Sequence, residues 1–370
     1  MVAAGMLHTV LLQSDGTAVA CGGNGEGQCD LPAVVAGLNC TQVAAGGEHT
    51  VLLRSDGSAV ACGRGADGRC TIPALVADLT YTQVAAGGAH TALLRSDGTA
   101  AACGRNAEGQ CDIPAFVAGR KYTQAAAGSL HTALLRRDGT AVACGQNADG
   151  QCDLPALAAD LRYAQVAAGG RHTVLLLSDG TAVACGKNAD HQCQLPALIA
   201  GLTYTQVAAG VWHTVLLRSD GTAVACGRNV RGQCDLPALV AGLTYTRIAA
   251  GGRHTVLLRS DGTAVACGLN GQGRCALPSL VAGLTYVAHL LPTLLLQALL
   301  DGDSISFVTF GGVELCRAGG GPTTRLAVIY DQLLGLHRAG RFGSGLARVD
   351  AVLPGGRLLS GVSAEDTVVN

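Results

Sequence analysis

Aromatic residues and charges are both scarce in this chain of 370 residues. Phe, Trp and Tyr make up 3% of the sequence, charged residues make up 14%, and the formal net charge is -1. So weak a charge creates no strong field, and we expect neither a nucleic-acid nor a membrane partner. The 53 glycines favour many tight turns and closely spaced strands over long helices.

Long hydrophobic runs are also missing. The longest aliphatic stretch, Leu290–Leu300, is interrupted by Pro292 and Gln297 and is too short to span a bilayer. The first repeat follows directly after Met1, without the basic segment and apolar run of a secretory signal. We therefore expect a soluble protein of the cytoplasm or the nucleus.

Histidines recur at an unbroken spacing of 41 residues and reveal seven copies of one unit within residues 1–287. They are His8, His49, His90, His131, His172, His213 and His254. In the unit 163–202, the segments 164–169, 172–176 and 181–185 have strand length, and Asp179-Gly180 predicts a tight hairpin. Polar and apolar residues alternate little in these segments, which indicates small sheets buried on both faces.

Sheets that are buried on both faces, with no helix to cover them, fit blades that pack around an axis. We predict an all-β fold for residues 1–287, a seven-bladed β-propeller in which the recurring Leu-Pro-Ala segment connects successive blades. A parallel β-solenoid is the alternative, but its coils are usually shorter and do not require a hairpin in each unit.

The recurring pattern VAAGGxHTVLLxSDGTxxxCGxNxxGQ resembles the repeat of the regulator of chromosome condensation family over about three quarters of the chain. Members of that family form seven-bladed propellers, so the resemblance implies one blade per copy. This sequence departs from the family pattern by placing cysteine where tryptophan commonly precedes the glycine and where leucine commonly follows Gly-Gln. Gly65, Arg69, Arg274 and His191 are local departures from the recurring unit.

Closure of the ring depends on how the first copy is completed. Repeat 1 begins at Val2 without the Tyr-Thr-Gln lead of the other copies, and residues Leu284–Val287 are available to supply it. In that arrangement the two ends of the propeller share one blade and latch the ring.

A metal site is the first alternative for the seven histidines. Equivalent sites on successive blades are separated by about 10 Å, whereas zinc requires ligands at about 2 Å, and no pair of histidines has zinc-motif spacing. We therefore interpret them as structural residues that bond backbone within their own blade, and we expect neither a metal nor a cofactor.

Fourteen of the 16 cysteines fall into two series that lie eight residues apart. The first series is Cys21, Cys62, Cys103, Cys144, Cys185, Cys226 and Cys267, and the second is Cys29, Cys70, Cys111, Cys152, Cys193, Cys234 and Cys275. A disulfide needs Cα atoms within about 7 Å, so only the pair inside one repeat could bond. Free, buried thiols that act as small hydrophobic residues are favoured, with seven disulfides inside the blades as the alternative.

No catalytic motif stands apart from the repeat. The Asp-Gly pairs recur in every unit at a turn that requires them, and there is no separate Ser-His-Asp order, phosphate loop or metal motif. We expect a protein that is not an enzyme.

Positions that vary between copies are free to carry specificity. The residue before each histidine varies most, and we expect a ring of partner-binding residues on one face: Leu7, Glu48, Ala89, Leu130, Arg171, Trp212 and Arg253. Trp212 with Arg171 and Arg253 is the expected anchor, because Trp and Arg are enriched in interface hot spots; surface drift is the alternative. A second variable and mostly acidic loop position would form a rim: Glu26, Asp67, Glu108, Asp149, Asp190, Arg231 and Gln272. Solvation alone also explains it.

The periodicity stops after Val287. Residues 288–301 form a Leu-rich linker, and residues 302–370 predict strands at 304–310, 313–316 and 348–353 and a helix at 323–336. This small α+β segment resembles an incomplete ubiquitin-like β-grasp domain without its closing strand. By position, Val352 would match the apolar recognition patch of ubiquitin, but the chain ends Val-Val-Asn and lacks the diglycine of conjugation.

These observations favour a non-enzymatic interaction scaffold or adaptor whose propeller binds a protein partner, with a link to ubiquitin-pathway proteins implied by the resemblance of the tail. The alternative comes from the founding members of the propeller family, which are guanine-nucleotide exchange factors for a small nuclear GTPase. The uniform units here contain no inserted loop that would act as an exchange wedge. Inhibition of a secreted enzyme, a function of some short-repeat relatives, is disfavoured by the missing signal.

Overall fold

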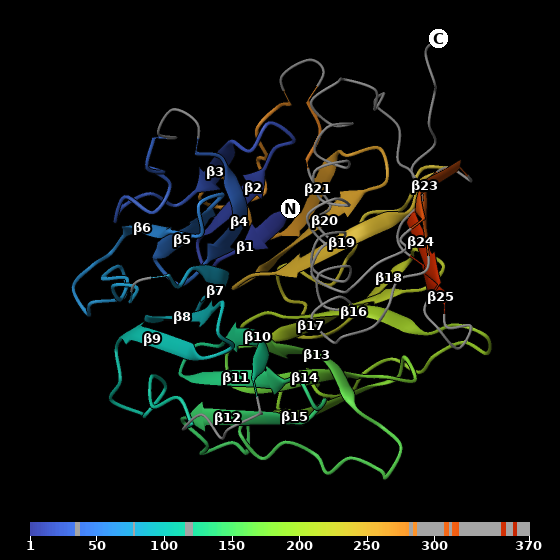
Figure 1. The fold of residues 1–370 in the computed structure, drawn as a ribbon, viewed down its shortest axis with the longest axis horizontal. Coiled ribbons are helices and arrows are strands. Elements are labelled where there is room, and N and C mark those ends of the chain that lie inside the picture. Colours follow the sequence, from blue (N-terminus) through green and yellow to red (C-terminus); the bar gives the residue numbers. More distant parts are fainter. Residues whose placement is uncertain are drawn as a thin grey trace. The chain divides into compact units, whose positions relative to one another are not determined.

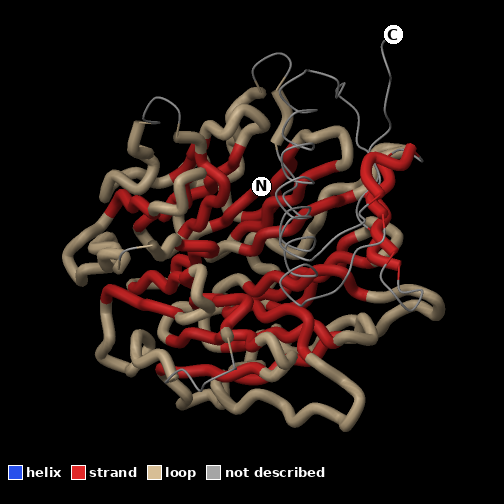
Figure 2. The backbone as a smooth tube through the Cα atoms, in the orientation of Figure 1, coloured by secondary structure: helices blue, strands red, loops and turns tan. Residues whose placement is uncertain are grey.

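The computed structural model describes residues 1–33, 38–76, 78–114, 121–280 and 284–286, together with the backbone of four strands between 307 and 360. The chain divides into two compact units, Met1–Val287 and Ala288–Asn370. Figure 2 shows that every regular element of the described residues is a strand. No helix that is long and apolar enough to cross a membrane occurs among them.

The first unit consists of seven three-stranded antiparallel sheets, each with its strands in sequence order, which we number as blades 1 to 7. Figure 1 shows them around a common axis, with the first strand of each blade innermost and the third outermost. Each inner strand contacts the inner strand of the next blade, and β1 contacts β19, so the ring is closed. A seven-bladed all-β propeller is therefore confirmed, and the solenoid alternative is wrong.

The strands have nearly the same bounds in every blade. They are β1 (Val2–Ala4), β2 (His8–Leu12) and β3 (Ala18–Gly22) in blade 1; β4 (Cys40–Ala45), β5 (His49–Arg54) and β6 (Ala59–Gly63) in blade 2; β7 (Tyr81–Ala86), β8 (His90–Arg95) and β9 (Ala100–Gly104) in blade 3; β10 (Tyr122–Ala127), β11 (His131–Arg136) and β12 (Ala141–Gly145) in blade 4; β13 (Tyr163–Ala168), β14 (His172–Leu177) and β15 (Ala182–Gly186) in blade 5; β16 (Tyr204–Ala209), β17 (His213–Arg218) and β18 (Ala223–Gly227) in blade 6; and β19 (Tyr245–Ala250), β20 (His254–Arg259) and β21 (Ala264–Gly268) in blade 7.

The Asp-Gly pairs form the predicted hairpins between the middle and outer strands. In blade 5, Asp179 Oδ1 accepts hydrogen bonds from the backbone N (2.9 Å) and the hydroxyl (2.7 Å) of Thr181. Gly180 adopts φ +81°, a conformation that costs glycine little and other residues much more. Local turn chemistry therefore fixes the register of each hairpin.

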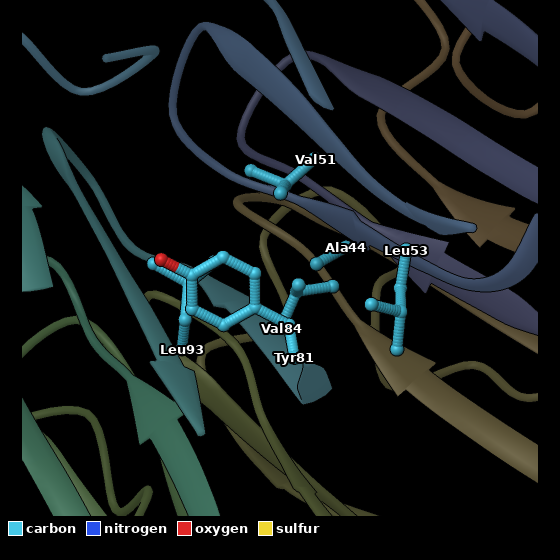
Figure 3. Packing of buried hydrophobic residues seen from close by; sticks show 6 residues of the cluster. All are labelled: Ala44, Val51, Leu53, Tyr81, Val84 and Leu93. Atoms are coloured by element: carbon cyan, nitrogen blue, oxygen red, sulfur yellow. The ribbon is translucent and has the colours of Figure 1, made fainter. Parts of the chain in front are cut away.

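The middle strands are buried on both faces, as predicted, but the same prediction was wrong for the outer strands, which are half-buried along their length because no strand lies beyond them in the described sheets. Val51 and Leu53 of β5 pack toward blade 3, against Tyr81 and Leu93 among others (Figure 3). Leu52 points the other way and belongs to the cluster shared with blade 1. Because successive side chains of a strand alternate between faces, one uniformly apolar strand serves two interfaces, and each fully buried side chain contributes about 1.5 to 3 kcal/mol.

The predicted latch is present at the end of the propeller. Tyr286 forms an antiparallel bridge with Gln13 of blade 1, and Ser14 N donates to Thr285 O at 2.8 Å. Tyr286 Oη donates to Pro278 O at 2.7 Å, as Tyr81 Oη does to Pro73 O at 2.6 Å in an interior blade. The last residues of the unit therefore complete the first blade.

The second unit contains a sheet with strand order β23-β22-β24-β25, and all three pairings are antiparallel. The strands are β22 (Phe307–Phe310), β23 (Val313–Arg317), β24 (Val349–Val352) and β25 (Leu358–Ser360). Three of them overlap the predicted strands, whereas β25 was not predicted. Val352 ends β24 opposite Leu358. The linker 288–301 and the helix predicted at 323–336 lie outside the described residues, so the ubiquitin-like interpretation stays a prediction.

Candidate functional site

The loops between inner and middle strands meet at one end of the axis, which we call the axial face. A ring of seven backbone hydrogen bonds, each 2.9 to 3.1 Å long, joins these loops from blade to blade. The bonds are Met6 N to Gly46 O, Gly47 N to Gly87 O, Gly88 N to Gly128 O, Ser129 N to Gly169 O, Gly170 N to Gly210 O, Val211 N to Gly251 O, and Gly252 N to Gly5 O. The axial face is consequently a rigid platform.

The first glycine of each loop is required by this close approach. A Cβ atom on Gly46 would lie 2.4 Å from His49 Cε1 and 2.5 Å from Gly87 O. Neither neighbour can yield, because one is a buried ring and the other is backbone of the next blade. The recurring glycine thus allows both the hydrogen-bond ring and the burial of the histidine.

The histidines form a second closed ring beneath these loops, and our expectation of backbone partners within one blade was wrong. His8 Nε2 lies 2.8 Å from Thr50 Oγ1 of the next blade, and His254 Nε2 lies 2.9 Å from Thr9 Oγ1 across the closure. The Thr50 hydroxyl donates to Gln28 O at 2.7 Å, so the histidine nitrogen must donate to it. Burial lowers the pKa of His8 to about 4 and that of His254 to about 3, with a further contribution from Arg274.

A cavity of about 350 Å³ opens on the axial face, and we call it the axial cavity. Its walls come from the inner loops of blades 1, 3, 4, 5 and 6. The lining residues are Met6, Gly88, Ala89, Ser129, Leu130, Gly170, Arg171, Val211 and Trp212. Most of these side chains are apolar, and Arg171 is the charged residue among them.

Four of the seven predicted ring residues are brought together in this cavity: Ala89, Leu130, Arg171 and Trp212. Leu7, Glu48 and Arg253 belong to the same set of loops but do not line it. Glu48 forms ion pairs with Arg64 at 3.0 Å and Arg69 at 3.9 Å. The seven residues therefore occupy equivalent positions in the blades, but only four of them line the cavity.

The sequence interpretation missed Met6, Ser129 and Val211, which line the cavity two residues before the histidine. The other four repeats have glycine at that position. The sequence did carry a signal for these residues. Three copies replace the recurring glycine at this position, and only those three place a side chain there.

Two cations engage the Trp212 ring. Lys187 Nζ lies 5.1 Å and Arg228 Cζ 5.7 Å from the ring centroid, distances at which a cation is attracted by the π-system. Lys187 N donates to Arg171 O at 2.8 Å and Arg228 N to Trp212 O at 2.9 Å, so the backbone holds both cations beside the cavity. Arg171 itself pairs with Asp149 at 3.4 Å.

The second variable loop of one blade reaches the ring residues of the next, as the pair of Asp149 in blade 4 with Arg171 in blade 5 shows.

The two arginines that replace the recurring glutamine fix cavity walls. Arg69 donates to Gly88 O at 3.1 Å, and Arg274 donates to Met6 O at 2.9 Å. These departures from the repeat therefore support the backbone of the site.

All cysteines of both series are free, as predicted, but they are half-buried, so the expectation of buried thiols was wrong. The first series lies on the outer strands, which have no strand beyond them to cover their outer edge. Burial is still sufficient, with the neighbouring thiols, to raise the pKa of Cys62 to about 12 and that of Cys103 to about 11.

We expect alkylation by iodoacetamide at pH 8 to be slow on the folded protein, because a thiol with a pKa near 11 is about one part in a thousand thiolate at that pH. After denaturation, the fifteen described cysteines should all react without any reductant. Mass spectrometry of the intact chain measures both states. Pairs of cysteines that react only after reduction would contradict the free-thiol interpretation.

Within the described part of the chain, no three His, Cys, Asp or Glu side chains are placed to hold a metal ion. Below the axial cavity, the space along the axis is only about 60 Å³ and is lined mostly by Ala and Gly, which is far smaller than a usual ligand pocket. The axial cavity is thus the main candidate site for a ligand.

Six units match the profile of the regulator of chromosome condensation (RCC1) repeat, at residues 40–69, 81–110, 122–151, 163–192, 204–233 and 245–274. No curated protein gives a significant match. Nothing in the comparisons supports the ubiquitin-like interpretation of residues 302–370.

Solved propellers share the fold at low sequence identity. Human WBSCR16 aligns with a TM-score of 0.59 and 18% identity, over 70% of this chain and 86% of its own. The CRINKLY WD40 ectodomain of the Arabidopsis thaliana receptor kinase ACR4 aligns with a TM-score of 0.57 and 20% identity, over 74% of this chain and 95% of its own. Saccharomyces cerevisiae Prp20p aligns with a TM-score of 0.56 and 19% identity, over 81% of this chain and 87% of its own. Its structure was described together with its binding to Gsp1p and histones.

Proposed function

The first unit of the chain carries RCC1 repeats, and we propose that it is a non-enzymatic scaffold whose axial face binds a protein partner. The axial cavity with Trp212 at its edge is the observation that supports this proposal. A half-buried Trp beside Arg171, on loops held by a closed ring of hydrogen bonds, has the composition and rigidity of an interface hot spot.

The lining of the cavity favours binding over catalysis. None of its nine residues is a His, Cys, Asp or Glu, the side chains that most often act as acid, base or nucleophile. The seven histidines lie below the loops, fully buried and bonded to threonines, so they are not accessible to a substrate. We therefore propose a role in recognition, with cytoplasmic or nuclear location still a prediction.

We expect Trp212→Ala to reduce capture of a protein partner from lysate of the source cell by about tenfold or more, because truncating a hot-spot Trp costs 2 kcal/mol or more of binding free energy. Quantitative mass spectrometry of the captured proteins measures the loss. Lys121→Ala is the control, because Lys121 lies just before the start of β10, at the end of the strand away from the axial face. Equal capture by the parent and Trp212→Ala would contradict the proposed site.

The exchange-factor alternative rests on the fold shared with Prp20p, whose structure was described with its binding to Gsp1p. At 19% identity this likeness supports the propeller and carries no residue of an exchange site. Release of a fluorescent guanine nucleotide from a small GTPase tests it directly. Accelerated release by the full chain would favour this alternative over the simple scaffold.

A further inference from the structure

Charges are divided unequally around the axial face. We consider three positions in each blade: the ring residue and the second variable loop position described above, and the residue that follows the outer strand, which also differs between blades. In blades 5 to 7 these positions carry five cations, Arg171, Lys187, Arg228, Arg231 and Arg253, and one acid, Asp190. In blades 1 to 4 they carry two cations, Arg64 and Arg105, and five acids, Glu26, Glu48, Asp67, Glu108 and Asp149.

Among the described residues, two cations beside the cavity have no carboxylate partner, whereas Arg171, which lines the cavity, pairs with Asp149 at 3.4 Å. Neither Lys187 nor Arg228 forms an ion pair within 4.0 Å in this part of the chain, although Arg64 in the equivalent position of blade 2 pairs with Glu48. Both instead lie over the ring of Trp212. A carboxylate that approached them would gain attraction without displacing another carboxylate.

The axial cavity itself suits an apolar side chain. Met6, Leu130, Val211 and Trp212 supply its walls, and about 350 Å³ is at the small end of the range of ligand pockets. Such a volume accommodates one large side chain and excludes a folded element. The site thus combines an apolar socket with a cationic flank on one side only.

We propose that the axial cavity binds an acidic segment of a partner protein, with one large apolar side chain in the cavity and flanking carboxylates on Lys187 and Arg228. This inference rests on the proposed function and specifies the chemistry of the partner. A single-stranded nucleic acid is a poorer match, because base stacking would require the Trp212 face that the two cations already cover.

The test uses the full chain and short synthetic peptides without Trp or Tyr. In the first, a central Phe is flanked by Glu and Asp; the second replaces Phe by Ala, and the third replaces the acids by Lys. Trp212 is the only tryptophan, so its fluorescence reports binding at the site. We expect the acidic Phe peptide to bind, the Ala peptide to bind about tenfold more weakly, and the Lys peptide not to bind.

Variants assign the binding to the proposed groups. Lys187→Ala/Arg228→Ala should weaken the acidic Phe peptide about tenfold at low salt, measured by anisotropy of a labelled peptide so that changes in Trp212 emission do not interfere. Lys121→Ala also removes a cation and should change the affinity less than about twofold. Far-UV circular dichroism shows that each variant keeps its strands.

Three results would overturn the inference: equal binding of the Lys peptide, tighter binding of oligothymidylate than of the acidic peptide, or unchanged binding by the double variant. If no peptide binds while capture of a protein partner still depends on Trp212, the acidic segment is wrong and the scaffold function stands. If capture is also independent of Trp212, both proposals fail.

Discussion

Lowering the pH from 6.5 to 5 is expected to unfold the propeller in one steep transition, because seven buried histidines must remain neutral in the folded state. Burial lowers the pKa of each to about 3 or 4, whereas the unfolded value is about 6.5. The histidine contribution to stability is complete above pH 6.5 and is lost as the pH falls toward the folded pKa values.

The size of the effect follows from the number of sites. Below pH 6.5, each histidine lowers the free energy of unfolding by about 1.4 kcal/mol per pH unit, so the seven together lower it by about 10 kcal/mol per unit. A domain stability of about 5 to 15 kcal/mol is then exhausted between about pH 6 and pH 5. Asp179 and Asp220 do not contribute in this window, because hydrogen bonds from Thr181 and Thr222 hold their pKa values below the usual range.

The measurement is urea unfolding at a series of pH values, followed by near-UV circular dichroism, with the pH slope giving the number of protons taken up. We expect a slope near eight protons, seven from the histidines and one from the Met1 amino group, whose pKa burial lowers to about 4, and a slope near seven for His131→Gln. His191→Asn is the control, because His191 is exposed at φ +64° and asparagine tolerates that conformation. A slope of two protons or fewer would contradict the role of the histidine ring.

How far the sequence predicts this molecule depends on whether a feature is local. Asp179-Gly180 and the strand-length segments predict one blade because each acts within a few residues. The partner of His8 could not be predicted, since Thr50 lies 42 positions away in the next blade while an identical Thr9 follows His8 directly. In a repeat of equal units, a contact within a blade and a contact with the next blade have the same pattern.

The candidate site was predicted in part for the same reason. Variation before the histidine identified Trp212 and Arg171, because a residue that differs between equal units is visible in one sequence. The cavity itself depends on which loops approach the axis, and on Met6, Ser129 and Val211 in place of glycine. The two cations over Trp212 follow β15 and β18, the outer strands of adjacent blades. Because they are far apart in the sequence, no local pattern predicts that they meet at one ring.

Ending the chain after residue 283 is expected to lower the melting temperature by about 10 °C relative to a chain that ends after residue 287. The shorter chain loses Tyr286, which is 4% exposed, and its hydrogen bonds to Gly262 O and Pro278 O. Loss of a buried aromatic side chain costs about 3 to 5 kcal/mol, and 1 kcal/mol corresponds to about 2 to 4 °C in a domain of roughly this size. Calorimetric scans of the two chains measure the difference.

Tyr286→Phe in the longer chain separates the hydroxyl from the ring, and it should cost only about 1 kcal/mol because one hydrogen bond is lost while burial is kept. The latch has a second consequence, since blades 1 and 7 also share the pairs of Thr9 with His254 and of Arg274 with Met6. Without Tyr286 the ring is held closed by these pairs, by the Gly252 N to Gly5 O bond and by the contact of β1 with β19, so the shorter chain should also unfold faster. Equal melting temperatures for the two truncated chains would mean that the contacts at the axial face suffice for closure.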